Sequence, residues 1–263
     1  MDSPCIRITI RVTELDRVIR QSSIMGNIYS LYRMTFPSKS LFSVDQIPDL
    51  TGQVTIVTGG NTGIGKETCK VLLLKNAKVY LAARSKARAD EAIQWLERET
   101  NGKSPIFLEL DLANLDSVRE AAEEFMSVNS HMHLTPIFTL VGGHARVVTT
   151  SSMAAFAIWK GSIVWETLGT DMASQKACKK AGTSMLSAPS TEGTNILRKA
   201  LIVYPASQGA LTQLWAGTMP EGLEHNGKFL VPWAQVGVMP PGARDGKVAE
   251  KLWTWLEEQV KGH

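Results

Sequence analysis

The chain has 263 residues, of which 44% are hydrophobic and 20% are charged, and its formal net charge is +3. This composition is ordinary for a globular protein, and the length fits one α/β domain. So mild a charge, with no stripe of Lys and Arg, argues against nucleic acid or a membrane surface as a partner. No run of about 18 apolar residues occurs, so we expect no membrane span. Three widely spaced cysteines without a Cys-x-x-Cys pair favour a reduced, cytoplasmic setting.

Residues 1–49 are expected to form an N-terminal lead-in that is partly disordered, with at most one helical turn before Pro48. Arginines recur between residues 7 and 20, as in a mitochondrial targeting helix, but Asp2, Glu14 and Asp16 are unusual for such a peptide. An unstructured tail, or a true start at Met25, is the alternative. Residues 50–263 are expected to form one domain.

Short hydrophobic runs alternate with amphipathic stretches from residue 53 onward. This alternation predicts a parallel sheet with right-handed crossovers. The helix that begins at Leu115 has Asn114 or Asp116 as its cap. The expected strands are 53–57, 78–83 and 105–110, and the expected helices are 63–75, 86–99 and 115–126.

The regular alternation ends after residue 128. A strand is expected at 145–150, and the segments 183–187 and 227–232 are weaker candidates for strands. Helices are expected at 201–217 and 248–260. The tryptophans Trp233, Trp253 and Trp255, with Leu252 and Leu256, are expected to be packing residues. The histidines His131 and His133 have no third ligand near them in sequence, so no metal site is expected.

A glycine-rich loop, Thr58-Gly-Gly-Asn-Thr-Gly-Ile-Gly65, joins the first expected strand to the first expected helix. Small residues let a backbone approach a pyrophosphate, and a helix N-terminus supplies free N–H groups and a partial positive charge. The loop therefore predicts a dinucleotide site. The residues expected to hold the nucleotide there are Gly59, Asn61, Gly63, Ile64 and Gly65.

The end of the second expected strand indicates which nucleotide is bound. NAD-binding proteins place an acid there for the ribose hydroxyls, but this chain has Ala82-Ala83-Arg84-Ser85-Lys86. A guanidinium can bind a phosphate with two hydrogen bonds, so Arg84 and Lys86 favour NADP as the cofactor. The alternative is that both side chains are only the solvated start of a helix.

Three segments together resemble the short-chain dehydrogenase/reductase family: Thr58–Gly65, Glu109–Leu112 and Arg146–Ser152. The stretches Ser30–Asp111 and Tyr204–Val260 are similar to fungal members near the retinol dehydrogenases. The resemblance implies a Rossmann-type α/β fold with a doubly wound parallel sheet. It also implies that Asp111 lies beside the adenine, Ser152 orients the substrate oxygen, Lys176 binds the nicotinamide ribose, and Thr194 belongs to a cofactor loop.

The chain departs from this family at the residue that moves the proton. No Tyr-x-x-x-Lys motif occurs; the best-matching segment keeps Lys176 but has Met172 where the Tyr belongs. A second register, at residues 187–191, loses both residues. A thioether cannot donate a proton, so the usual acid is absent in either register.

Two spans are also too short for the crossovers of this fold. Residues 128–145 cannot hold a complete βαβ crossover, and six residues between Lys176 and Thr183 cannot hold a crossover helix. We therefore expect the second half of the sheet to be incomplete and the family's dimer interface to be damaged. Misplaced exon boundaries in the gene would produce the same pattern.

Two functions fit these residues. The first is an NADP-dependent oxidoreductase that interconverts a carbonyl and an alcohol on a hydrophobic small molecule, with a role in fungal secondary metabolism. The second is a degenerate NADP-binding pseudoenzyme or interaction module that lacks the catalytic Tyr.

Overall fold

A computed structural model describes residues 39–129, 139–141, 144–151, 163, 165–168, 172, 176, 204–239 and 241–262. The expected strand at 183–187 and the first residues of the helix expected at 201–217 lie outside this part of the chain.

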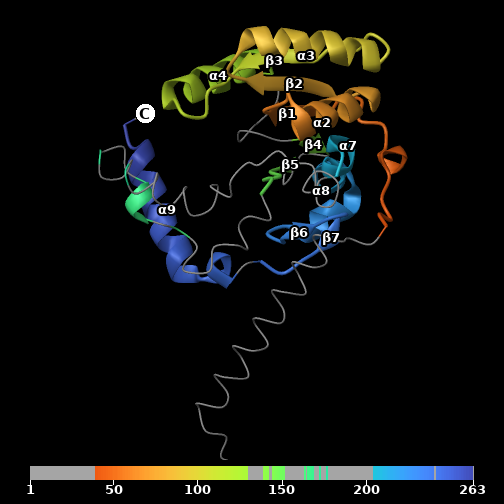
Figure 1. Ribbon diagram of the computed structural model, residues 1–263. Coiled ribbons are helices and arrows are strands. Elements are labelled where there is room, and N and C mark those ends of the chain that lie inside the picture. The colour runs from red at the N-terminus through yellow and green to blue at the C-terminus, as the bar shows by residue number, and fades with distance from the viewer. Residues whose placement is uncertain are drawn as a thin grey trace, which may run out of the picture.

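The first half of the chain forms a three-stranded parallel sheet in the order β1-β2-β3 (Figure 1). Its elements are β1 (Val54–Thr58), α2 (Gly63–Leu74), β2 (Lys78–Ala83), α3 (Lys86–Glu99) and β3 (Ile106–Glu109), followed by α4 (Leu115–Val128). The predicted strand 78–83 and helix 86–99 are confirmed at their exact bounds, and the other four elements lie within two residues of the prediction.

The helices cover both faces of this sheet. On one face, α2 and α3 pack against alternate residues of β2, which are Val79, Leu81 and Ala83. On the other face, α4 packs against the intervening Tyr80 and Ala82. A change of face after the third strand is the arrangement of a doubly wound sheet. The fold is therefore the expected Rossmann type, and the described residues contain its first half.

Polar contacts hold both ends of α4. Its N-cap is Asn114, whose side chain accepts a hydrogen bond from the amide of Asp116. At its C-terminal end, buried Asn129 donates to the Tyr80 hydroxyl (2.9 Å) and accepts from Lys78 Nζ (3.0 Å). Tyr80 also meets Phe125 edge to face, with ring centroids 4.9 Å apart. These contacts fix α4 on the sheet.

The segment before β1 contributes to the core. One 3-10 turn, η1 (Val44–Gln46), lies where one helical turn was expected. The side chains of Phe42, Ile47 and Leu50 are buried in the same cluster as α2 and α3. Burial of these three side chains ties the lead-in to the sheet.

The second half differs from the prediction. The strand expected at 145–150 is reduced to β5 (His144–Arg146), which pairs antiparallel with β4 (Thr139–Val141). The strand expected at 227–232 is reduced to β6 (Leu230–Val231), which pairs with β7 (Gln235–Val236). Neither strand joins the parallel sheet.

The two C-terminal helices predicted from the sequence are present with changed bounds. The helix expected at 201–217 begins at Ala206, directly after Pro205, because proline has no backbone N–H and fits only at the start of a helix. It is divided at Ala210 into α7 (Ala206–Gly209) and α8 (Leu211–Thr218). A 3-10 segment, η4 (Pro220–His225), follows α8. Figure 1 shows α7 and α8 beside α2, and α9 (Gly246–Val260), preceded by η5 (Pro241–Arg244), apart from the parallel sheet. A further 3-10 turn, η3, spans Trp165–Thr167.

Candidate cofactor site

The glycine loop between β1 and α2 depends on three glycines. Gly59 and Gly63 have φ angles of +66° and +51°, which residues with a side chain rarely adopt. Gly65 lies against the backbone of Gly59, because a Cβ on Gly65 would lie 2.9 Å from the Gly59 carbonyl carbon. The loop therefore brings bare backbone to the start of α2.

The first turn of α2 is suited to an anion. The helix begins after Thr62, whose side chain makes no capping hydrogen bond, and the first turn contains no acid. The amides of this turn have no partner within the helix and carry the positive end of its dipole. Gly63 and Ile64 are exposed, so a phosphate group could reach these amides.

Two backbone hydrogen bonds bring the ends of the three strands to one edge. The amide of Gly59 donates to the carbonyl of Ala82 (2.9 Å), and the amide of Leu110 donates to the carbonyl of Ala83 (3.2 Å). The glycine loop, Arg84 and the residues after β3 therefore share one side of the sheet. Asp111 lies there, where its carboxylate accepts from the amide of Ala113 (3.0 Å).

Arg84 and Lys86 differ in their availability. The Arg84 side chain is exposed, and among the described residues it makes no ion pair. The Lys86 ammonium is paired with Asp90 at 3.1 Å and lies 5.2 Å from the centre of the Phe107 ring. Arg84 is thus the cation that is free to take a ligand, and Lys86 is already engaged.

Of the residues expected to act near the substrate and the nicotinamide, the structure describes only Lys176, together with Met172 at the position of the family's Tyr. Ser152 and Thr194 lie outside the described residues. Met172 and Lys176 are both helical and exposed, and Met172 is 85% exposed. In the described part of the chain, no hydrogen bond or ion pair joins Lys176 to the glycine loop or to Arg84.

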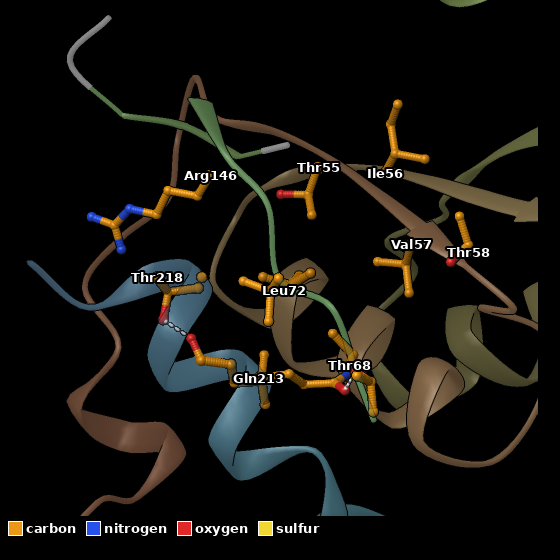
Figure 2. A pocket seen from close by; sticks show the side chains of 13 residues that line it. Thr55, Ile56, Val57, Thr58, Thr68, Leu72, Arg146, Gln213 and Thr218 are labelled. Atoms are coloured by element: carbon orange, nitrogen blue, oxygen red, sulfur yellow. Dashed lines mark hydrogen bonds between the residues drawn. The ribbon is translucent and has the colours of Figure 1, made fainter. Parts of the chain in front are cut away.

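A small pocket of about 130 Å³ lies beside β1 (Figure 2). It is bounded by all of β1 except Val54, by α2, by α8 and by the segment after β5. Polar side chains line much of it, including Thr68, Thr150 and Gln213. Sequence analysis did not single out these residues, although Gln213 is a polar residue between the apolar positions Leu211 and Leu214.

Arg146 holds one wall of this pocket. Its Nη1 donates to the carbonyl of Met219 (2.6 Å) and of Ala216 (3.2 Å), at the C-terminal end of α8. Burial lowers the pKa of Arg146 from its ordinary value. Carbonyls at a helix C-terminus favour a cation, so this contact joins β5 to α8.

A parallel sheet with helices on both faces, carrying a glycine loop at the carboxyl end of its first strand, defines a Rossmann-type nucleotide-binding protein. The sequence model of the short chain dehydrogenase family matches residues 53–256. The chain belongs to this family of oxidoreductases, whose members bind nicotinamide cofactors.

The relatives include proteins from fungi and an animal. Two short-chain dehydrogenase/reductases of Armillaria gallica are 38% and 39% identical to this chain, and each alignment covers 91% of this chain and 100% of the relative. Retinol dehydrogenase 11 of Mus musculus is 45% identical over 32% of this chain and 27% of its own length. The expected likeness to fungal and retinol-dehydrogenase-like members is thus confirmed.

The alignments also bear on the shortened spans. The first Armillaria gallica alignment is 314 positions long, although this chain has 263 residues. The relative therefore has residues, within the aligned span, that this chain lacks.

Of the described residues, no helix is long and apolar enough to cross a membrane.

Proposed function

We propose that the chain binds NADP and uses it to interconvert a carbonyl and an alcohol on a hydrophobic small molecule. The observation that carries the cofactor choice is the exposed, unpaired Arg84 at the end of β2, where an NAD-binding protein would have an acid. When bound, the reduced nicotinamide supplies the hydride.

The charges at this edge favour a phosphorylated ribose. A guanidinium offers two parallel N–H donors to a phosphate, and no carboxylate among the described residues is paired with Arg84. The first turn of α2 takes the diphosphate on its amides. Asp111 follows β3 at the same edge, where its carboxylate accepts from the amide of Ala113. This position supports a role for Asp111 beside the adenine.

The remaining roles follow the family pattern. Lys176 binds the nicotinamide ribose, Thr194 belongs to the loop that covers the cofactor, and Ser152 orients the substrate oxygen. We propose one NADP-binding domain over residues 50–263, a cytoplasmic location and a role in fungal secondary metabolism. The fungal origin of the Armillaria gallica relatives supports the last point.

Turnover tests the proposed reaction. The purified chain is incubated with NADPH, or with NADH, and a panel of lipophilic ketones and aldehydes, and the loss of absorbance of the reduced nicotinamide is followed. We expect turnover with NADPH that exceeds turnover with NADH. No turnover above the control without enzyme, with any member of the panel, would contradict the proposal.

A second function, NADP binding without chemistry, is favoured by one residue. Met172 stands where the family has its acid, and a thioether has no proton to give. Under this alternative the chain holds the nucleotide as a pseudoenzyme or as a partner of another protein. Nucleotide binding would then be intact while turnover is absent.

Restoring the acid separates the two functions. If only the proton donor is missing, Met172→Tyr should raise turnover by about 100-fold or more, the usual contribution of a general acid. The matched control is Met126→Tyr, at a half-exposed Met of α4 away from the loop. A Met172→Tyr variant that binds NADPH but does not turn over would favour binding without chemistry.

A further inference from the structure

A chain of side-chain hydrogen bonds crosses from the segment after β5 to the first turn of α2. Thr150 Oγ1 donates to Gln213 Oε1 at 2.8 Å. Gln213 Nε2 in turn donates to Thr68 Oγ1. Thr68 Oγ1 then donates to the carbonyl of Ile64 at 2.9 Å. Figure 2 shows the Gln213 side chain extending from α8 toward Thr68.

The direction of these bonds is fixed by their donors. The single hydroxyl proton of Thr68 is committed to Ile64, so the oxygen of Thr68 can only accept from Gln213. The amide nitrogen of Gln213 must therefore face Thr68, and its oxygen must face Thr150. The carboxamide of Gln213 fits this place, because it carries a donor nitrogen and an acceptor oxygen on the same group.

The two ends of this chain of bonds belong to different segments of the sequence, each with a role in the family pattern. Ile64 is in the first turn of α2, whose amides are proposed to take the diphosphate. Thr150 stands two residues before Ser152, which the family pattern assigns to the substrate oxygen. Gln213 is the one side chain in the described residues that bonds to both Thr68 and Thr150.

A second contact places the same helical segment against the loop. Gly209, at the end of α7, faces Ile64 so closely that a Cβ there would lie 2.9 Å from Ile64 Cδ1. The segment formed by α7 and α8 therefore contacts α2 twice: at Ile64 in the first turn and, through Gln213, at Thr68 one turn further on.

We propose that Gln213 is a positioning residue, which holds the first turn of α2 in its nucleotide-binding geometry by tying it to Thr150. The proposal rests on the proposed binding of NADP at this turn. Gln213 acts through Thr68 and Ile64, without touching the nucleotide itself. Removal of the hydrogen bond between Thr150 and Gln213 should therefore change the conformation of the glycine loop only when Gln213 is present.

Nucleotide affinity provides the first test. Kd for NADPH is measured by calorimetry for Gln213→Leu, Thr150→Val and the double variant. The matched control is Gln208→Leu, at an exposed position of α7. Losing one net hydrogen bond should weaken binding about fivefold in each single variant. The double variant should be no weaker than Gln213→Leu, and Gln208→Leu should match the wild type.

The conservative change Gln213→Glu sharpens this test. A carboxylate still accepts from Thr150 but cannot donate to Thr68, so this variant should bind NADPH as weakly as Gln213→Leu. Thr150 is exposed, so Thr150→Val should leave the fold intact by circular dichroism. Unchanged affinity in Thr150→Val, or effects that multiply independently in the double variant, would overturn the role of Gln213.

Hydrogen exchange separates this proposal from the proposed function. If the wild type does not bind NADPH at all, the proposed function fails, and the amides of residues 63–72 then report on Gln213 alone. We expect their exchange to be about fivefold faster in Gln213→Leu and Thr150→Val than in the wild type and Gln208→Leu. Equal exchange rates in all four proteins would overturn the proposal.

Discussion

Gly65 packs against the backbone of Gly59, so no side chain fits between the start of α2 and the end of β1. The variant Gly65→Ala should therefore displace the loop and weaken NADPH binding by at least about tenfold, since backbone cannot yield as a flexible side chain can. A titration of the purified variant with NADPH measures this loss.

Gly246, the first residue of α9, is the matched control for Gly65. A Cβ on Gly246 meets nothing within 4 Å, and its φ angle is outside the left-handed region. Gly246→Ala should leave NADPH affinity unchanged and stabilise the fold by about 0.4–1 kcal/mol. Equal NADPH affinities for the two variants would contradict the close approach at Gly65.

Cys69 lies under the same loop and makes stability depend on pH. Burial raises the pKa of its thiol to about 12, because the apolar core does not solvate a thiolate. In the unfolded chain the thiol ionises near its ordinary value of about 8.5. The folded state thus keeps a proton that the unfolded state loses, and this contribution to stability, complete below about pH 8.5, is lost as the pH rises toward 12.

The comparison of wild type with Cys69→Ala tests this pH dependence. Between pH 8 and pH 10, the wild type should lose about 2 kcal/mol more unfolding free energy than the variant does. Urea denaturation at both pH values measures the difference. Parallel losses in the two proteins would show that Cys69 is not the group responsible.

The elements of the first half were predictable because each carries its own pattern. In β2, Val79, Leu81 and Ala83 face one helical layer while Tyr80 and Ala82 face the other, so the strand appears as a continuous apolar run. The glycine loop follows β1 directly, which placed the start of α2. Local signals of this kind need no information from distant residues.

The prediction of a strand at 145–150 was wrong beyond Arg146, because tertiary contacts determine the path of this segment. A run of Val and Thr predicts a strand, but a strand needs a neighbour. Here the Arg146 guanidinium is bound to the end of α8, and Thr150 is bound to Gln213, so distant side chains decide the path of this segment. No local pattern carries that information.

Two tryptophans predicted to be packing residues have different surroundings. Trp233 is 9% exposed and meets Tyr204 edge to face at 4.9 Å, as expected. Trp253 on α9 is 64% exposed, so that part of the prediction was wrong. The amphipathic pattern of α9 identified its apolar side, but α9 has no buried residue to pack it against the described core.

Substitution of each tryptophan by Ala should separate these roles. Trp233→Ala should destabilise the fold by about 3–5 kcal/mol, the usual loss for a buried large aromatic. Trp253→Ala should change the unfolding free energy by less than about 1 kcal/mol, as is typical of surface positions. Chemical denaturation measures both, and similar losses for the two variants would contradict the burial described.

At the scale of the whole molecule, this chain is shorter than the span over which it aligns with a relative. The parallel sheet that the structure describes has three strands, and the alignment with the Armillaria gallica relative contains positions that this chain lacks. The short spans at 128–145 and 176–183 predict that this loss falls within them. They do not predict the antiparallel pairs β4-β5 and β6-β7, which form from segments only a few residues long.

The shortened spans fall where the family usually forms its dimer helices, so we predict a monomer. Light scattering coupled to size exclusion at micromolar concentration should give a mass near 28.8 kDa. A stable dimer would contradict the predicted damage to this interface. Sequencing of the transcript is the matched check, since additional coding residues within these spans would restore the helices.

The common position of the glycine loop, Arg84 and Asp111 was predictable, because each follows a strand of one parallel sheet. The glycine loop, Arg84 and Asp111 follow three strand ends, and parallel strands bring such ends to one edge. The bracing role of Gln213 was not predictable, because Thr150, Thr68 and Gln213 come from three distant segments. The ion pair between Lys86 and Asp90, which competes with a phosphate for Lys86, was also not predicted, although the two residues are four apart on one helix.

The measurement that bears most directly on the proposed cofactor is a set of four dissociation constants: those of NADPH and NADH, each for the wild type and for Arg84→Ala. We predict that the wild type binds NADPH at least about tenfold more tightly than NADH. Arg84→Ala should remove most of this preference by weakening NADPH while leaving NADH unchanged. A wild type that binds both nucleotides equally, or a preference that survives in Arg84→Ala, would contradict the account.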